Sequence, residues 1–337
     1  MPASAGFEVY MYDVTDFLHR LDHLHHVNPN QLLSDRLPDL LYGFVKKEAS
    51  GSSLEDVVEH HFRGVGKLLR GKLVISVSTF AKCDRSDTIK IAMATELLHN
   101  ASLVHDDICD RDDLRRGNAC VWKAFGSETA LCFGDWLIGL SFKLIASLDH
   151  PSAGAGISSL LAETLCALSK GQAREFATKP VDNWSEYLEI VRQKTSPLIT
   201  FPVVAPLTLG NLQEEISIAK RAITELGVAY QIANDIEGVL GDDGHENPLG
   251  DLRRSAPNAV MIANVERTNT HFHNSGHRPQ GHDSIPYCLQ KIDGNISTAT
   301  ADLEQLPADL QAAIDPLVRY LKHSIRMRTT VAQRRYA

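Results

Sequence analysis

Residues 103–117 read Leu-Val-His-Asp-Asp-Ile-Cys-Asp-Arg-Asp-Asp-Leu-Arg-Arg-Gly, and they continue a run of strong helix formers at 89–100 that has no Pro or Gly. The run follows Ser86 and Asp87, residue types that commonly cap the start of a helix. The sequence therefore predicts one helix from Ser86 to Asp112, ending in a dense group of carboxylates.

The carboxylates of this helix end are spaced for a shared ligand. Asp106 and Asp110 lie four residues apart and Asp107 and Asp110 three apart, so they share nearly one face, where like charges repel. A bound cation removes that repulsion, and oxygen ligands favour Mg²⁺ shared with substrate phosphates. Arg115 and Arg116 add guanidinium groups suited to phosphate oxygens. The alternative is a solvated acidic helix end followed by a basic turn.

The spacing Asp-Asp-x-x-Asp, then four residues and Arg-Arg-Gly, resembles the first aspartate-rich motif of the trans-isoprenyl diphosphate synthases (polyprenyl synthetase family). The preceding Glu-Leu-Leu-His-Asn-x-Ser-Leu-Val-His strengthens the resemblance, which extends over roughly residues 40–265. It implies a bundle of helices around a central cavity, like the class I isoprenoid synthases, and a homodimer. It also implies two to three Mg²⁺ ions bound with the substrate diphosphate.

Composition and charge limit the possible classes. The chain has 337 residues, 43% of them hydrophobic and 23% charged, as in a soluble globular protein. A net charge of −8 argues against nucleic acid as a partner. No uninterrupted apolar run reaches the about 20 residues that span a membrane, and the N-terminus does not resemble a signal peptide. We therefore expect a cytoplasmic protein without a transmembrane segment.

The chain shows helical periodicity throughout, with no internal repeat and no convincing strand. We expect an all-α fold and a single domain over 1–337, with a helical N-terminal extension at 1–40. The polar segment 267–286 breaks the helical period and is expected to be an irregular loop. Pro38 is expected to mark a turn.

A basic segment precedes the aspartate helix. Residues 64–72 read Gly-Val-Gly-Lys-Leu-Leu-Arg-Gly-Lys, which places Lys67 and Arg70 one turn apart. The segment resembles the family's Gly-Gly-Lys-x-x-Arg, with Val65 in place of the first Gly, and the resemblance implies that Lys67 and Arg70 bind the diphosphate of isopentenyl diphosphate. His99 occupies the position of another residue that binds this diphosphate, and Arg116 completes the expected site. A plain basic turn is the alternative.

Residues 183–199 predict a helix in which Pro197 causes a kink. The resemblance implies that Lys194 and Thr195 contact the allylic diphosphate. Just before it, residues 171–175 (Gly-Gln-Ala-Arg-Glu) resemble the family's Gly-Gln-x-x-Asp/Glu motif.

The second aspartate-rich motif departs from the family pattern. Where the family has Phe-Gln-Ile-x-Asp-Asp-x-x-Asp, residues 230–238 match at Gln231 and Asp235, but Asn234 and Gly238 replace two aspartates. Residues 247–257 also lack two expected lysines. We expect Asp235 to bind metal, with Asn234 as a neutral neighbour and Gln231 facing the same cavity.

The altered motif also resembles the Asn-x-x-x-Ser-x-x-x-Glu metal motif of class I terpene cyclases. Asn234, Gly238 and Asp242 follow its spacing and share one helix face, although Gly238 offers no side-chain oxygen. Arg335–Tyr336, or alternatively Arg319–Tyr320, is similar to the Arg-Tyr pair with which bacterial cyclases hold diphosphate. Asp242 and Asn234 would then be metal ligands.

The expected enzyme ionises an allylic diphosphate, with Asp106, Asp107, Asp110, Lys194 and Asp235 as catalytic residues. The favoured activity is a prenyltransferase that condenses this cation with isopentenyl diphosphate to a C20 or longer product. The resemblance implies that a large aromatic side chain about one turn before the first motif would limit the product to short chains, and residues 101 and 102 there are both small, so we expect room for a long chain. The alternatives are a terpene cyclase, a prenyltransferase with another acceptor and a non-catalytic partner subunit.

Overall fold

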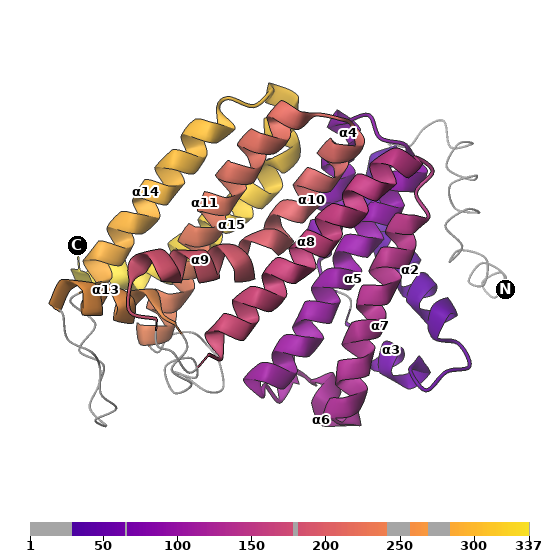
Figure 1. The fold of residues 1–337 in the computed structure, drawn as a ribbon, viewed down its shortest axis with the longest axis horizontal. Coiled ribbons are helices and arrows are strands. Elements are labelled where there is room, and N and C mark those ends of the chain that lie inside the picture. The colour runs from indigo at the N-terminus through magenta and orange to yellow at the C-terminus, as the bar shows by residue number, and fades with distance from the viewer. Residues whose placement is uncertain (1–28, 65, 178–180, 241–256, 269–283, 337) are drawn as a thin grey trace, which may run out of the picture. The chain divides into compact units, whose positions relative to one another are not determined.

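The computed structural model describes residues 29–64, 66–177, 181–240, 257–268 and 284–336. Its fold is all-α, as the sequence predicts (Figure 1). The helices are α2 (Pro29–Ala49), α3 (Glu55–Phe62), α4 (Leu69–Phe80), α5 (Arg85–Asp110), α6 (Val121–Phe125), α7 (Ser127–Ala146), α8 (Pro151–Glu175), α9 (Trp184–Lys194), α10 (Ser196–Leu209), α11 (Gln213–Leu240), α13 (Ala259–Thr268), α14 (Ile285–Leu303) and α15 (Ala308–Tyr336).

The contacts divide the chain into two compact units, 1–161 with 205–212 and 162–204 with 213–337. The expected N-terminal extension (1–40) and the expected loop (267–286) fall largely outside the described residues. Within residues 29–40, α2 is helical and continues through Pro38, so the predicted turn at Pro38 is wrong. A proline is tolerated inside a helix at the cost of one backbone hydrogen bond.

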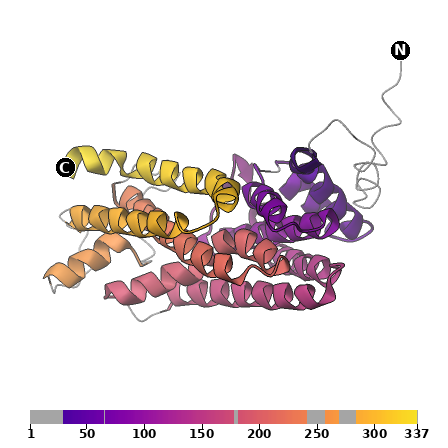
Figure 2. The same cartoon turned by 90° about the horizontal axis from the view of Figure 1, so that it is seen from above.

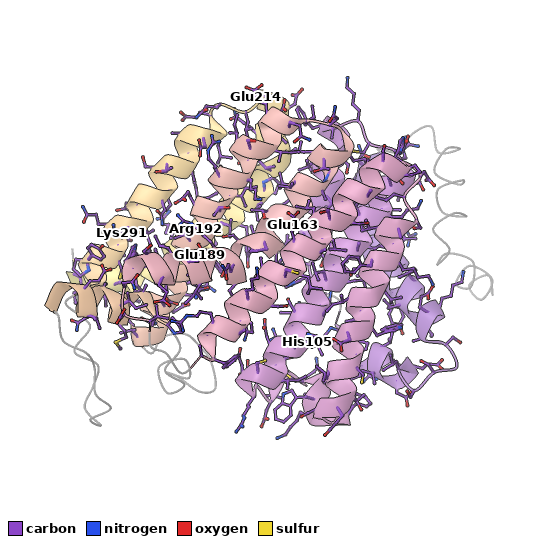
Figure 3. The ribbon with its side chains drawn as sticks, viewed as in Figure 1. His105, Glu163, Glu189, Arg192, Glu214 and Lys291 are labelled. Atoms are coloured by element: carbon purple, nitrogen blue, oxygen red, sulfur yellow. The ribbon has the colours of Figure 1, made fainter. Side chains whose placement is uncertain are left out.

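The first unit is built around α5. Its residues from Ile91 to Leu98 are all buried, which is the pattern of a helix covered on every side. It packs most extensively on α7, which lies beside it in Figures 1 and 2, and also on α4. Near the C-terminal end of α5, His105 (Figure 3) donates from Nε2 to the carbonyl oxygen of Leu131 at 3.3 Å. This close approach requires Gly134, because a Cβ there would lie 2.2 Å from the imidazole Nε2.

The ends of α5 differ slightly from the predicted Ser86–Asp112. The N-cap residue is Asp84, and no side chain caps it. Asp87 is buried instead and accepts hydrogen bonds from the backbone N–H of Asp149 and from Nδ1 of His150, both at 2.8 Å. The helix ends at Asp110 because Arg111 adopts a left-handed conformation with φ of 57°.

A short hairpin follows α5, where no strand was expected. The two-residue strands β1 (Leu114–Arg115) and β2 (Asn118–Ala119) pair antiparallel. The turn between them consists of Arg116 and Gly117, both with positive φ, as the tightest hairpin turns require. The hairpin folds the Arg-Arg-Gly sequence back toward the end of α5.

The second unit is built around α11, which packs on α14 and α15; the three helices lie side by side in Figure 1. Its hydrophobic cluster includes Ile232, Ile236, Trp184 and Tyr187. The start of α9 is capped by Asn183, whose Oδ1 accepts from the backbone N–H of Glu186 at 2.9 Å.

The predicted helix over 183–199 is two helices. The helical conformation is interrupted at Thr195. Helix α10 then begins at Ser196, with Pro197 as its second residue. Because proline lacks an N–H, it suits the first turn of a helix and disfavours a continuous one. The break therefore replaces the expected kink.

Among the described residues, α7 is long and apolar enough by length and composition to cross a membrane, although the sequence suggested no such run. Its most apolar window is 44% buried, and the helix packs on α5. The core helix of a soluble protein has the same properties, so this helix is weak support for a membrane span.

Candidate active site

The aspartates of the first motif lie on the last two turns of α5. Asp107 is buried, whereas Asp106 and Asp110 are partly exposed. Arg115, on β1 of the hairpin, donates from Nε to both carboxylate oxygens of Asp107, at 2.8 and 3.0 Å, and Nη2 adds a third contact. The fork satisfies the buried carboxylate and fixes the hairpin against the helix end.

Arg116 points to the basic loop before α4. Its Nη1 donates to the carbonyl oxygen of Gly64 at 3.1 Å, and the guanidinium lies directly over Gly66. A Cβ on Gly66 would be 2.8 Å from Nη2, so only glycine permits this contact. The hairpin thus brings Arg116 to the segment that carries Lys67, an exposed side chain, and Arg70, which is partly buried.

His99, on α5, lies in the same neighbourhood. Burial lowers the pKa of His99 well below its usual value, and the positive charges of Arg70, Arg116 and Arg115 lower it further. The imidazole is therefore neutral at pH 7. Its Nδ1 is buried and has no hydrogen-bond partner within the described part of the chain. A buried donor or acceptor of this kind is typical of a site that awaits a ligand.

Sequence reasoning missed His61. Its Nε2 lies 3.0 Å from Oδ1 of Asn100, and burial lowers its pKa to about 4, despite the opposing hydrogen bond to Asn100. Asn100 in turn donates to the carbonyl oxygen of Glu96 at 2.7 Å. No motif indicated His61, because the contact joins α3 to α5 across 39 residues.

Glu96 was also missed, although it lies within the segment that precedes the first motif. It is 2% exposed and accepts from the backbone N–H of Gly71 at 2.7 Å, in the first turn of α4. Burial raises its pKa, while the Gly71 N–H and the charge of Arg70 act in the opposite direction. A buried carboxylate at a helix N-terminus fixes the start of α4, which follows the basic loop.

The donor set at the end of α5 suits magnesium. Across the described residues, no three His, Cys, Asp or Glu side chains already form a metal-binding group. Mg²⁺ in enzymes that bind phosphates typically uses one or two carboxylates together with phosphate oxygens, rather than a complete protein cage. Carboxylates on adjacent turns beside two arginines match that arrangement.

In the second unit, Asp235 is 6% exposed, and its carboxylate accepts three hydrogen bonds from donors in the described part of the chain. The hydroxyl of Tyr187 donates to its Oδ2 at 2.7 Å, the backbone N–H of Ala259 donates to Oδ2 at 2.8 Å, and Nε2 of Gln231 donates to Oδ1 at 2.9 Å. These donors come from α9, α13 and α11 itself. Three donors stabilise the ionised carboxylate.

Two of the predicted allylic residues, Thr195 and Gln231, are linked by hydrogen bonds to Asp235. Oγ1 of Thr195 donates to Oε1 of Gln231 at 3.4 Å. Lys194 forms an ion pair with Glu175, the last residue of the Gly-Gln-Ala-Arg-Glu motif. The structure therefore brings together, within this unit, the Lys194–Thr195 break and the second motif.

The structure describes only some of the residues that the resemblance to terpene cyclases predicted as metal or diphosphate ligands. Oδ1 of Asn234 is buried and has no hydrogen-bond partner among the described residues. Asp242 and the side chain of Arg335 lie outside the described residues. Tyr320 is 44% exposed, and its neighbour Arg319 pairs with Asp315 on the surface.

The chain is similar in sequence to proteins named as isoprenyl diphosphate synthases. A "Short chain isoprenyl diphosphate synthase" of Methanocaldococcus jannaschii is 26% identical over 236 residues, covering 69% of this chain and 71% of the relative. A "Geranylgeranyl diphosphate synthase" of Saccharolobus solfataricus is 31% identical over 234 residues, covering 65% and 68%.

Solved structures agree on the fold. The geranylgeranyl pyrophosphate synthetase from Geoglobus acetivorans superposes with a TM-score of 0.69 at 24% identity, covering 86% of this chain and 99% of that one. A polyprenyl synthetase from Streptomyces coelicolor gives 0.71 at 20% identity, covering 92% and 99%.

The sequence model of the family described as "Polyprenyl synthetase" matches residues 52–292, a range that contains both aspartate-rich motifs and the basic loop. The predicted enzyme class, a prenyltransferase of the polyprenyl synthase type, is confirmed. The chain belongs to the polyprenyl synthetase family.

Proposed function

We propose that this prenyltransferase condenses an allylic diphosphate with isopentenyl diphosphate and forms a product of C20 or longer. The observation that carries the proposal is the convergence of Arg116 and the basic loop, beside the neutral His99. An enzyme that only cyclises an allylic diphosphate has no need for a second diphosphate site.

Lys67, Arg70, His99 and Arg116 would hold the diphosphate of isopentenyl diphosphate. Three cations neutralise the phosphate charges, and the neutral imidazole of His99 offers an N–H donor. The buried and unpartnered Nδ1 of His99 supports this role, because a ligand oxygen can satisfy it.

The proposed metal ligands are Asp106, Asp107 and Asp110 in one unit and Asp235 with Asn234 in the other; Asp242 is a further candidate. When bound, two to three Mg²⁺ ions would neutralise the diphosphate leaving group of the allylic substrate. Arg115, which holds Asp107, can also donate to a phosphate oxygen from its remaining N–H groups.

Lys194, Thr195 and Gln231 would bind the allylic diphosphate. A cation and two polar side chains stabilise the charge that develops as the allylic C–O bond breaks. An apolar pocket then protects the carbocation from water until the double bond of isopentenyl diphosphate attacks it.

The length of the product follows from the residues one turn before the first motif. Ala101 is buried and Ser102 partly buried, and Oγ of Ser102 donates to the carbonyl oxygen of His99 at 2.8 Å. Small side chains leave room for a long prenyl chain, and several relatives are named geranylgeranyl diphosphate or pyrophosphate synthases, which supports this length. Ala101→Phe should shorten the product, and unchanged chain lengths would show that another layer closes the pocket.

A terpene cyclase remains the second candidate, because Asn234 stands where the family's second motif has aspartate. The deciding experiment incubates purified protein with Mg²⁺ and geranylgeranyl diphosphate, with and without isopentenyl diphosphate. Elongated diphosphates that require isopentenyl diphosphate support the prenyltransferase. A hydrocarbon or alcohol formed equally in both reactions would refute it and support the cyclase.

We further propose that the chain forms a single isoprenoid synthase domain. We also propose that the protein is cytoplasmic and that it is a homodimer. The family match covers residues from both compact units, which supports one domain. On α7, Leu131 is 53% exposed and no described atom lies within 4 Å of a Cβ built on Gly139, so part of this helix surface is open to a partner. Light scattering that gives only monomer would refute the dimer.

A further inference from the structure

Tyr187 is a buried ionisable side chain with no role in the function proposed above. It lies on α9, is 1% exposed, and its ring packs against Trp184 within the hydrophobic cluster of the second unit. Its hydroxyl nevertheless reaches Oδ2 of Asp235 on α11 at 2.7 Å. A core position that needed only an aromatic ring would be served as well by phenylalanine, so the hydroxyl needs its own explanation.

The start of α13 approaches the same carboxylate oxygen. The backbone N–H of Ala259, the first residue of α13, donates to Oδ2 of Asp235 at 2.8 Å. Asn258 caps this helix through Oδ1, which accepts from Val260 N–H at 2.9 Å, and its Nδ2 donates to the backbone carbonyl of Asp235 at 3.1 Å. Two donors from two different helices therefore fix one oxygen.

The other carboxylate oxygen is linked toward the proposed allylic diphosphate site. Gln231 donates to Oδ1 of Asp235 and accepts from Thr195 at the end of α9. Tyr187, Asp235, Gln231 and Thr195 thus form one continuous chain of hydrogen bonds, which begins on α9 and ends at Thr195, the residue that follows this helix.

Resting on the proposed function, we propose that Tyr187 is a positioning residue, which together with the start of α13 orients the Asp235 carboxylate for the substrate–Mg²⁺ complex. Groups that hydrogen-bond a metal-binding carboxylate set its orientation, and their loss typically weakens metal binding by about 10- to 100-fold.

The test compares Tyr187→Phe with Tyr287→Phe. Tyr287 is a matched control because its ring contacts the same Trp184, with centroids 5.5 Å apart. Calorimetry measures the Mg²⁺ dependence of inorganic diphosphate binding, and a steady-state assay gives the Mg²⁺ concentration for half-maximal turnover. Thermal unfolding reports stability separately.

We expect Tyr187→Phe to raise both Mg²⁺ requirements by roughly tenfold, with turnover recovering at high Mg²⁺, while Tyr287→Phe stays within about twofold of the parent protein. A lower melting temperature with an unchanged Mg²⁺ dependence would overturn the inference, because Tyr187 would then act only in packing.

If Tyr187→Phe does not fold, Asn258→Ser takes its place, since serine keeps a capping oxygen for α13 but loses the amide that donates to Asp235. An unchanged Mg²⁺ dependence in that variant would likewise overturn the inference. If the parent protein itself shows no Mg²⁺-dependent diphosphate binding or turnover, the proposed function fails instead.

Discussion

Gly66→Ala should selectively damage the proposed isopentenyl diphosphate site. A Cβ on residue 66 would lie 2.8 Å from Nη2 and 2.9 Å from Nη1 of Arg116, both closer than real Cβ contacts, and 3.0 Å from Cζ, which is also tight. The guanidinium is the far end of a flexible, exposed side chain, so it would move and the backbone would stay. The contact from Arg116 to the carbonyl oxygen of Gly64 would be lost with it.

The expected decrease in kcat/KM follows from the loss of a charge-assisted hydrogen bond between Arg116 and the diphosphate of isopentenyl diphosphate. A hydrogen bond to a charged group contributes about 1.5–3 kcal/mol, which corresponds to roughly 10- to 150-fold in kcat/KM for isopentenyl diphosphate. The stability of the fold should change by less than about 1 kcal/mol, because Arg116 is a surface residue. The KM for the allylic substrate should stay within about twofold, since its proposed residues belong to other elements.

Gly64→Ala is the matched control, because no atom lies within 4 Å of a Cβ there. Steady-state kinetics with each substrate varied in turn, together with thermal unfolding, would separate the outcomes. If Gly66→Ala and Gly64→Ala have the same kcat/KM for isopentenyl diphosphate, or if both substrates are affected equally, then Arg116 is not positioned for this diphosphate.

Other perturbations test the metal sites and the α7–α8 junction. Asp106→Ala should cost several kcal/mol of transition-state stabilisation with an unchanged circular dichroism spectrum; near-parental turnover would rule out its metal role. For a prenyltransferase, Asn234→Asp with Gly238→Asp should raise elongation, because each adds a carboxylate for Mg²⁺, and lower elongation would favour the cyclase. The hydrogen bond to Asp87 raises the pKa of His150, so its contribution to stability is complete below the usual histidine pKa and is lost as the pH rises through the raised value. Melting temperatures measured across that range should fall in the parent and less so in His150→Gln; parallel curves would contradict this.

Much of the fold could be predicted locally. The long helix that ends in the first motif was found to within two residues at either end, because helix propensity and the absence of Pro and Gly are properties of neighbouring residues. Pro197 marked the place where the helix changes direction, although the sequence predicted a kink and the structure has two separate helices, α9 and α10. Pro38 was misjudged because a proline's local cost can be outweighed by burial of the rest of α2, where Leu33, Leu37 and Leu41 are fully buried.

The sequence by itself also determined the family, since Asp-Asp-x-x-Asp, Arg-Arg-Gly and the basic segment have fixed spacings that can be read along the chain. Only the tertiary structure decided which side chains meet. Arg115 pairs with Asp107 because an unexpected hairpin turns at Arg116, and Tyr187 meets Asp235 across 48 residues. Such contacts depend on how helices distant in sequence pack. A buried polar pair also stabilises the fold strongly only after that packing has excluded water, because electrostatic attraction is weak in water.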